Sequence, residues 1–364
     1  MRNEDQEYFS DPEFLENFKK YEAMMKGGPS VFLDADELTD IAEYYLIKEE
    51  NEEGANACIN YALALYPEAT APLIFQARQH LLKDDLDTTQ TLCDAIPDQE
   101  DREVIFLNAE IMVRREQAQA AIEYLLARGK NISEDYDYYL YDAAYIFMDY
   151  NEFEAANDLA ERLKNYAPDW YKTWQIMADS LLGLNRFNKA LLFINKMLDQ
   201  DPFSVETWNW ASEAYSGIEK FEKAVEAADY ALAIDPTDPR AMQLKGHAFL
   251  HMDLYEQALS QYEQVLDATP NDETTMAFMA YTYLCMNELG KAKEIIEEAE
   301  KLCEPDSPDL QLIYEQHANV LAALECFDEA LFYLDKAEAI GGNTPNDYDA
   351  IRADLIRRRE EKGK

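Results

Sequence analysis

The sequence predicts an all-α protein built from repeated helical hairpins. Prolines recur at a constant interval of 34 residues, at Pro168, Pro202, Pro236 and Pro270. Between these prolines, apolar residues follow the i, i+3, i+4, i+7 spacing of amphipathic helices in two successive segments. Because proline cannot continue a helix, each one is expected to end the second helix of a hairpin. The chain is therefore expected to form an array of stacked hairpins, an α-solenoid.

One unit, residues 205–238, shows the repeated pattern most completely. Its positions 4, 7, 8, 11, 17, 20, 24, 27 and 32 are Trp208, Ala211, Ser212, Tyr215, Phe221, Ala224, Ala228, Ala231 and Pro236. The small residue at position 8 and the alanine at position 20 allow two helices to approach closely. This set resembles the tetratricopeptide repeat, with a large residue at 4, a small one at 8, an aromatic at 11, alanine at 20 and proline at 32. Equivalent units are expected at 36–69, 70–101, 102–136, 137–170, 171–204, 205–238, 239–272, 273–310 and 311–344.

The flanking units match this pattern less well than the central ones. Glu43 stands at position 8 of the first unit, where a small residue is usual. Thr89 replaces the alanine of position 20 in the second unit, and Ala118 replaces the large residue of position 17 in the third. The eighth unit carries an insertion around residues 304–308.

The resemblance implies a domain organisation and a handedness. The chain is similar to an acidic, bacterial-type tetratricopeptide array of about nine repeats, whose hairpins wind into a right-handed superhelix. We expect an N-terminal capping helix and linker at 1–35, the array at 36–344, and a C-terminal capping helix with a basic tail at 345–364. Capping helices are needed because each unit covers only its neighbours.

Both predicted caps have helix signals in the sequence. Ser10-Asp11-Pro12 is typical of a helix start, and Gly27-Gly28-Pro29 is typical of a stop. The apolar stripe of the first cap is Phe14, Phe18, Tyr21 and Met25, and that of the last is Tyr348, Ile351 and Leu355.

The net charge of −42 restricts the partner classes. Nucleic acid and anionic membrane surfaces are disfavoured as ligands, because both require clustered Lys and Arg. The charge favours solubility and a protein or peptide partner that is neutral to basic. The alternative is that most of these carboxylates only solvate the outer faces of the helices.

Cysteine usage and the absence of apolar runs predict a cytoplasmic protein. The five cysteines are far apart and include no C-x-x-C pair, so free thiols in a reducing compartment are expected. The N-terminal residues include no apolar signal region, and no apolar run approaches the length of a membrane span.

No motif in the sequence predicts catalysis. The G-x-S-x-G, Walker, G-x-G-x-x-G and H-E-x-x-H patterns are all missing, so we expect a non-enzymatic protein without a cofactor. Two histidines, His247 and His251, lie four residues apart on one helix face and could chelate zinc with Glu213 as a third ligand. A pair of polar groove residues is the favoured interpretation, and no metal is assigned.

In tetratricopeptide proteins the first helix of each pair lines a concave groove, and its positions 2, 5 and 9 face that groove. In the unit 137–170 these positions are Tyr138, Tyr141 and Tyr145. Tyrosine offers a large contact area and a hydroxyl group, which suits a peptide-binding surface. The alternative is that these rings pack on the neighbouring unit.

The next units place polar residues at the same three positions. One interpretation is a ladder of inter-repeat ion pairs, and another is a hydrogen-bonding track for an extended peptide, because amide side chains both donate and accept. The two are compatible. The candidate residues are Lys172, Glu206 and Arg240 at position 2, Gln175, Asn209 and Gln243 at position 5, and Asp179, Glu213, His247 and Tyr281 at position 9.

Two specialised types of tetratricopeptide protein are disfavoured. Chaperone-binding domains hold a C-terminal carboxylate with a Lys and Asn clamp, and no adjacent pair of units has that set. Glycosyltransferase-associated arrays carry a column of Asn, whereas here only isolated residues such as Asn209 and Asn319 occur.

The expected function is a protein-interaction scaffold that binds a peptide or an extended protein segment in its groove. A ligand-responsive sensor and a metal-dependent enzyme that uses Glu213, His247 and His251 are the alternatives. The basic run Arg357-Arg358-Arg359 is expected to complement the dipole of its own helix, or else to support self-association through an acidic surface.

Overall fold

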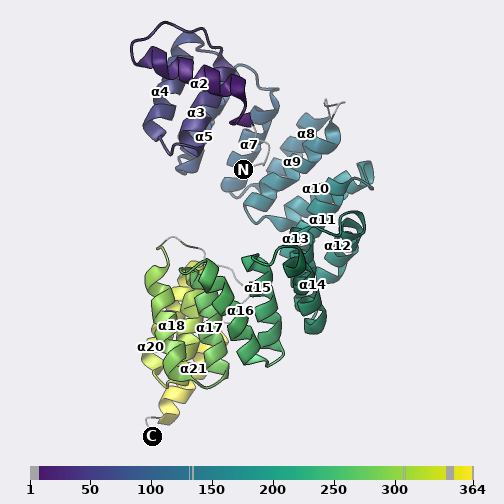
Figure 1. Cartoon of the computed structure of the whole chain (residues 1–364), viewed down its shortest axis with the longest axis vertical. Coiled ribbons are helices and arrows are strands. Elements are labelled where there is room, and N and C mark those ends of the chain that lie inside the picture. The colour runs from purple at the N-terminus through teal and green to yellow at the C-terminus, as the bar shows by residue number, and fades with distance from the viewer. Residues whose placement is uncertain are drawn as a thin grey trace. The chain divides into compact units, whose positions relative to one another are not determined.

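The structure, a computed structural model, describes residues 8–130, 132, 135–305, 307, 309–341 and 348–362. In these ranges the chain is all-α, as predicted, with twenty α-helices and no strand (Figure 1). The helices are α2 (Pro12–Met25), α3 (Ala35–Ile47), α4 (Glu52–Leu65), α5 (Thr70–Leu82), α6 (Leu86–Ala95), α7 (Arg102–Arg114), α8 (Ala118–Gly129), α9 (Tyr136–Asp149), α10 (Phe153–Tyr166), α11 (Tyr171–Gly183), α12 (Phe187–Gln200), α13 (Val205–Gly217), α14 (Phe221–Ile234), α15 (Pro239–His251), α16 (Tyr255–Ala268), α17 (Glu273–Cys285), α18 (Leu289–Leu302), α19 (Leu310–Ala323), α20 (Phe327–Gly341) and α21 (Tyr348–Lys362).

The spaced prolines end helices where the sequence predicts. Pro168, Pro202, Pro236 and Pro270 each lie two residues beyond the last residue of α10, α12, α14 or α16. The indole of Trp174 donates to the Pro168 carbonyl at 2.9 Å, and that of Trp208 donates to the Pro202 carbonyl at 2.9 Å. A proline carbonyl after a helix therefore anchors the first helix of the next pair.

Consecutive helices from α3 onward form hairpins, and close packing within a hairpin requires small residues. Ser212 of α13 is fully buried, and its Oγ donates to the Ala224 carbonyl of α14 at 2.9 Å. A Cβ added to Gly246 in α15 would lie 2.5 Å from the ring of Tyr262 in α16. Both residues occupy position 8, so the predicted reason for a small side chain there is confirmed.

Every hairpin turn contains one residue with a left-handed backbone, and none of these residues is glycine. Their φ angles lie between 50° and 60°, a region that costs an ordinary L-residue roughly 1 kcal/mol. Asn and Asp tolerate this conformation better than Glu. The nine residues are Glu50, Asp84, Glu116, Asn151, Asn185, Glu219, Asp253, Asn287 and Glu325.

The chain divides into two compact units, Met1–Ile176 and Met177–Lys364. In the first, one cluster of buried residues joins α2, α3, α4 and α5, and another joins α5, α6 and α7. In the second, buried clusters join α15 to α17, α17 to α19 and α19 to α21. Each cluster involves helices that are close in sequence, as expected for a solenoid.

Helices lie near both ends of the described chain, α2 and α21. Asp11 caps α2 by accepting the Glu13 amide at 2.7 Å, with Pro12 as the first helical residue. After α2, Gly27 has a φ of 89°, a conformation that suits glycine, so the predicted stop is confirmed. In α21, Tyr348 and Leu355 are the buried residues. Among the described residues, every helix falls short of the length and apolar character that crossing a bilayer requires.

Candidate functional site

An aromatic cluster on α9 and at the start of α11 surrounds a lysine side chain. The Lys172 ammonium lies 4.8 Å from the ring centroid of Tyr138, 4.8 Å from that of Tyr141 and 5.8 Å from that of Trp170. The rings of Tyr138 and Trp170 meet edge to face at 4.7 Å. This cluster belongs to the first unit of the chain, and Tyr138 remains 42% exposed.

The same cluster continues along α9. The Tyr141 hydroxyl donates to Oε1 of Gln175 at 3.1 Å, and the Tyr141 and Tyr145 rings lie 4.8 Å apart. The three tyrosines therefore share one helix face, as their spacing predicts. They pack partly on residues of the following hairpin, and they also present ring surface that a partner can contact.

A hollow of about 870 Å³ lies beside this cluster, in the first unit, and the sequence alone did not reveal it. Its walls come from α3, α5, α7 and α9, the first helices of four successive hairpins. Phe106 is 6% exposed there, and Tyr141 and Tyr145 form one side. The remaining lining residues are Glu43, Ile47, Arg78, Arg102, Glu103, Glu110, Asp142, Ile146 and Asp149.

Ion pairs between hairpins cross this hollow. Arg78 contacts Glu103 at 2.9 Å and Glu110 at 3.3 Å, and Arg102 contacts Asp142 at 2.8 Å. Burial raises the pKa of Glu110, and the attraction of Arg78 offsets this shift only in part. With five carboxylates and two arginines in its lining, the hollow has a negative formal charge.

The candidate residues of the second unit include a group of carboxylates. Burial, together with repulsion from Glu206 and Glu213 of α13, raises the pKa of Asp179 in α11 to about 6. Arg240 of α15 pairs with Glu213 at 3.0 Å and donates to Oε1 of Gln243 at 3.3 Å. This ion pair joins position 2 of one hairpin to position 9 of the preceding one. It is one rung of the expected inter-repeat ladder of ion pairs.

The amide residues differ in accessibility. Asn209 is only 7% exposed and donates to Oδ2 of Asp238 at 2.7 Å. Gln243 donates to the Thr275 hydroxyl at 3.1 Å. Asn209 thus contributes to packing between hairpins, whereas Gln175 and Gln243 remain partly exposed.

The two histidines pack on different aromatic rings. His247 lies 3.9 Å from the Phe278 ring, whereas His251 stacks on Phe221 at 4.9 Å. Burial, with smaller contributions from Arg240 and His251, lowers the pKa of His247 to about 3, so this imidazole is neutral at physiological pH. Tyr281, the last candidate, is 37% exposed on α17. In the part of the chain that the structure describes, no three His, Cys, Asp or Glu side chains form a group that could hold a metal ion.

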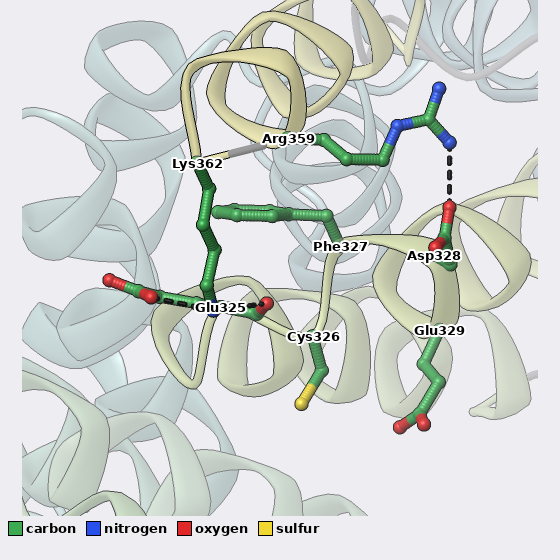
Figure 2. Close-up of a pocket in the computed structure, with 7 residues that line it drawn as sticks. All are labelled: Glu325, Cys326, Phe327, Asp328, Glu329, Arg359 and Lys362. Carbon is green, nitrogen blue, oxygen red and sulfur yellow. Dashed lines mark hydrogen bonds and ion pairs between the residues drawn. The ribbon is translucent and has the colours of Figure 1, made fainter. Parts of the chain in front are cut away.

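A smaller hollow of about 350 Å³ lies where α21 meets the start of α20. Figure 2 shows the Lys362 side chain running past the ring of Phe327 while Arg359 reaches Asp328. The ion pairs measure 2.6 Å for Arg359–Asp328 and 2.7 Å for Lys362–Glu325. The cationic residues of the tail are thus engaged within the chain, and we assign this hollow to the docking of α21.

Comparison with known proteins identifies the repeat. Residues 239–272 match the tetratricopeptide repeat. The crystal structure of a tetratricopeptide repeat protein from Parabacteroides merdae superposes with a TM-score of 0.59, at 17% identity, over 71% of this chain and 98% of that one. The chain therefore contains a tetratricopeptide repeat at 239–272 and shares the fold of a tetratricopeptide-repeat structure. The resemblance inferred from the spaced prolines is confirmed, and so is the solenoid fold class.

The chain has three further similarities. Residues 38–201 match the ChAPs, described as Chs5p-Arf1p-binding proteins. A tetratricopeptide repeat protein of Thermus thermophilus has a TM-score of 0.47 at 18% identity, covering 52% of this chain and all of its own. The Cut9–Hcn1 complex of APC/C has a TM-score of 0.48 at 17% identity, covering 90% of this chain and 64% of the other. No curated protein matches the sequence.

Some residues of the hollow would have been hard to select from the sequence. Arg78 and Glu110 occupy position 9 in successive units, but both units depart from the consensus pattern. Arg102 and Asp142, which pair in the structure, are 40 residues apart. The opposite charges of Arg78 and Glu110 were the available signal, and they do not specify which charges meet.

Proposed function

We propose that this protein is a non-enzymatic scaffold whose first helices bind an extended segment of another protein. The observation that carries the proposal is the partly exposed aromatic cluster of Tyr138, Tyr141 and Trp170, with Gln175 beside it. Large rings with a polar group at the edge are typical of residues that dominate protein-binding energy. Side-chain amides next to them supply donors and acceptors for a peptide backbone.

The similarities support a protein as the partner. The ChAPs are named for binding Chs5p and Arf1p, and the region that resembles them, 38–201, includes α9 and its tyrosines. Because this chain has a net charge of −42, we propose a partner that is neutral to basic.

We propose one set of surface residues in each of the two compact units, 1–176 and 177–364. In the first unit they are Tyr138, Tyr141, Tyr145, Lys172 and Gln175. In the second they are Asp179, Glu206, Glu213, Arg240, Gln243, His247 and Tyr281, whereas the predicted Asn209 is buried and supports the packing of the hairpins.

The test compares capture of the partner by variants with equal stability. Tyr138→Ala combined with Gln175→Ala removes ring area and an amide from partly exposed positions, and we expect it to weaken capture of the main partner from native cells by at least roughly tenfold. Quantitative affinity purification with peptide identification measures this.

The matched control is Tyr166→Ala, which removes a tyrosine that is 57% exposed on α10, a second helix of the same unit. Capture is expected to be unchanged by this substitution. Equal loss in both variants, or full capture by the double variant, would contradict the proposed surface.

A further inference from the structure

We infer that the hollow between α3, α5, α7 and α9 receives a lysine or arginine side chain of the bound protein segment. This inference rests on the proposed scaffold function and specifies the chemistry of its partner.

The dimensions of the hollow suit a long side chain rather than a flat contact. Its volume of about 870 Å³ lies within the range of ordinary ligand sites. Ile47 of α3 is 37% exposed, while the side chains of Glu110 and Asp142 are 15% and 17% exposed. An entering side chain thus meets apolar surface for its methylene groups and acidic groups for its charged end.

The charges of the hollow select a cation. Five carboxylates line it, against two guanidinium groups, which leaves a formal excess of three negative charges. Both arginines already form ion pairs with lining carboxylates, at 2.8 to 3.3 Å. A bound carboxylate or phosphate would add like charge, whereas an ammonium or guanidinium would reduce the excess.

Glu110 is subject both to burial and to the neighbouring charges. Burial is the main reason that its pKa is raised, and Glu103 and Asp149 add repulsion against the attraction of Arg78. A further cation nearby would favour the ionised form of Glu110. Binding of a basic side chain and ionisation of Glu110 therefore support each other.

The aromatic wall provides a second contact for the same ligand. Lys172 already places an ammonium 4.8 Å from the centroid of the Tyr141 ring, so this ring accepts a cation within the protein itself. Tyr145 lies 4.8 Å from Tyr141 and lines the hollow with it. A partner lysine or arginine would find the same chemistry on the hollow side of this pair.

The experiment uses the full chain and a library of short peptides, degenerate except at a central residue that is Arg, Lys, citrulline or Glu. We expect peptides with central Arg or Lys to bind roughly tenfold better than those with citrulline, which is neutral but similar in shape. Glu110→Gln combined with Asp149→Asn should abolish this preference while peptides still bind.

The matched control is Glu123→Gln combined with Asp158→Asn, which removes two exposed carboxylates from α8 and α10 of the same unit. It should retain the preference at the same ionic strength, and circular dichroism checks that both double variants fold. Binding without a preference for a basic residue, or equal loss in the control, overturns this inference and leaves the scaffold function standing. If no peptide binds the unmodified chain, the proposed binding of an extended segment fails, and this inference fails with it.

Discussion

At the scale of single residues, Asp179 illustrates how a first-helix surface stores electrostatic free energy. Its carboxyl group is partly buried in α11 and faces the field of Glu206 and Glu213, so its pKa rises to about 6. Among the described residues, one ion pair involves these three carboxylates, and it joins Arg240 to Glu213. Above pH 6 the folded protein therefore holds a charge that its surroundings disfavour.

Substituting Asp179 with Asn should stabilise the fold in a pH-dependent way. An unfolded aspartate titrates near pH 3.9, so below about pH 4 the group is neutral in both states and costs nothing. Between about pH 4 and pH 6 the unfolded chain loses the proton first, and above pH 6 the folded state bears the full penalty. We expect a gain of about 1–2 kcal/mol in the free energy of unfolding at pH 7.5, allowing for solvent screening.

Urea denaturation of Asp179→Asn at several pH values measures this gain, which should decline to nothing by about pH 4. The control is Asp199→Asn, which removes an exposed carboxylate from α12. A gain that is independent of pH, or equal in the control, would show that Asp179 is not the titrating group.

At the scale of helices, α21 is held largely by charge. It buries only Tyr348 and Leu355, whereas Arg352 forms ion pairs with Asp335 at 2.9 Å and with Glu338 of α20. Arg359 and Lys362 add the two pairs shown in Figure 2. A network around one arginine contributes more than isolated surface pairs, which are worth little.

Replacing Arg352 with Gln should loosen α21 selectively. We expect amide hydrogen exchange in residues 348–362 to become about tenfold faster, equivalent to about 1.4 kcal/mol, with α19 unchanged. Hydrogen-exchange mass spectrometry of peptides from α19 and α21 measures these exchange rates. Arg357→Gln is the control, because Arg357 pairs only with Asp354 and Glu361 of its own helix among the described residues; similar acceleration in both variants would refute the role of Arg352.

Helices are also where the sequence was most informative. A proline every 34 residues marks the end of a second helix, and the apolar spacing before it determines which face is buried. Helices α5 to α8 form even though consensus residues are replaced in repeats 70–101 and 102–136. In α6, Thr89 stands in place of the alanine, and it is fully buried with its hydroxyl donating to the Asp85 carbonyl. A small β-branched residue can therefore fill the place of the usual alanine.

The candidate surface was less predictable than the helices. Position within a helix predicted that Tyr138, Tyr141 and Tyr145 share a face, because that depends on local geometry alone. It did not predict that Asn209 is buried against Asp238, nor that Arg78 and Glu110 meet across a hollow. Those facts depend on how hairpins pack on each other, which the pattern of one repeat does not contain.

At the scale of the whole molecule, the repeat architecture makes stability local. Ile111 of α7 is fully buried in a cluster with α5 and α6. In such arrays the loss of one contact weakens mainly the neighbouring repeats.

The substitution Ile111→Ala should therefore act locally. Its cavity is expected to cost about 2–4 kcal/mol and to accelerate amide exchange in α5 to α9, while α17 to α20 retain their protection. The corresponding substitution in the second unit, Ile296→Ala in α18, should accelerate amide exchange in α17 to α20 and leave α5 to α9 protected. Uniform loss of protection along the chain in either variant would instead indicate one cooperative unit.

The left-handed residue in each hairpin turn has a consequence for engineering this protein. Four of these positions carry glutamate, which fits the conformation less well than asparagine or glycine. Three of these glutamates, Glu50, Glu116 and Glu219, lie in turns far apart along the array, so small gains from glycine at each would add nearly independently, whereas Glu325 is retained for its ion pair with Lys362. They also lie outside the helix faces proposed for binding. The thermal tolerance of the scaffold can therefore be raised turn by turn while its recognition surface keeps its native chemistry.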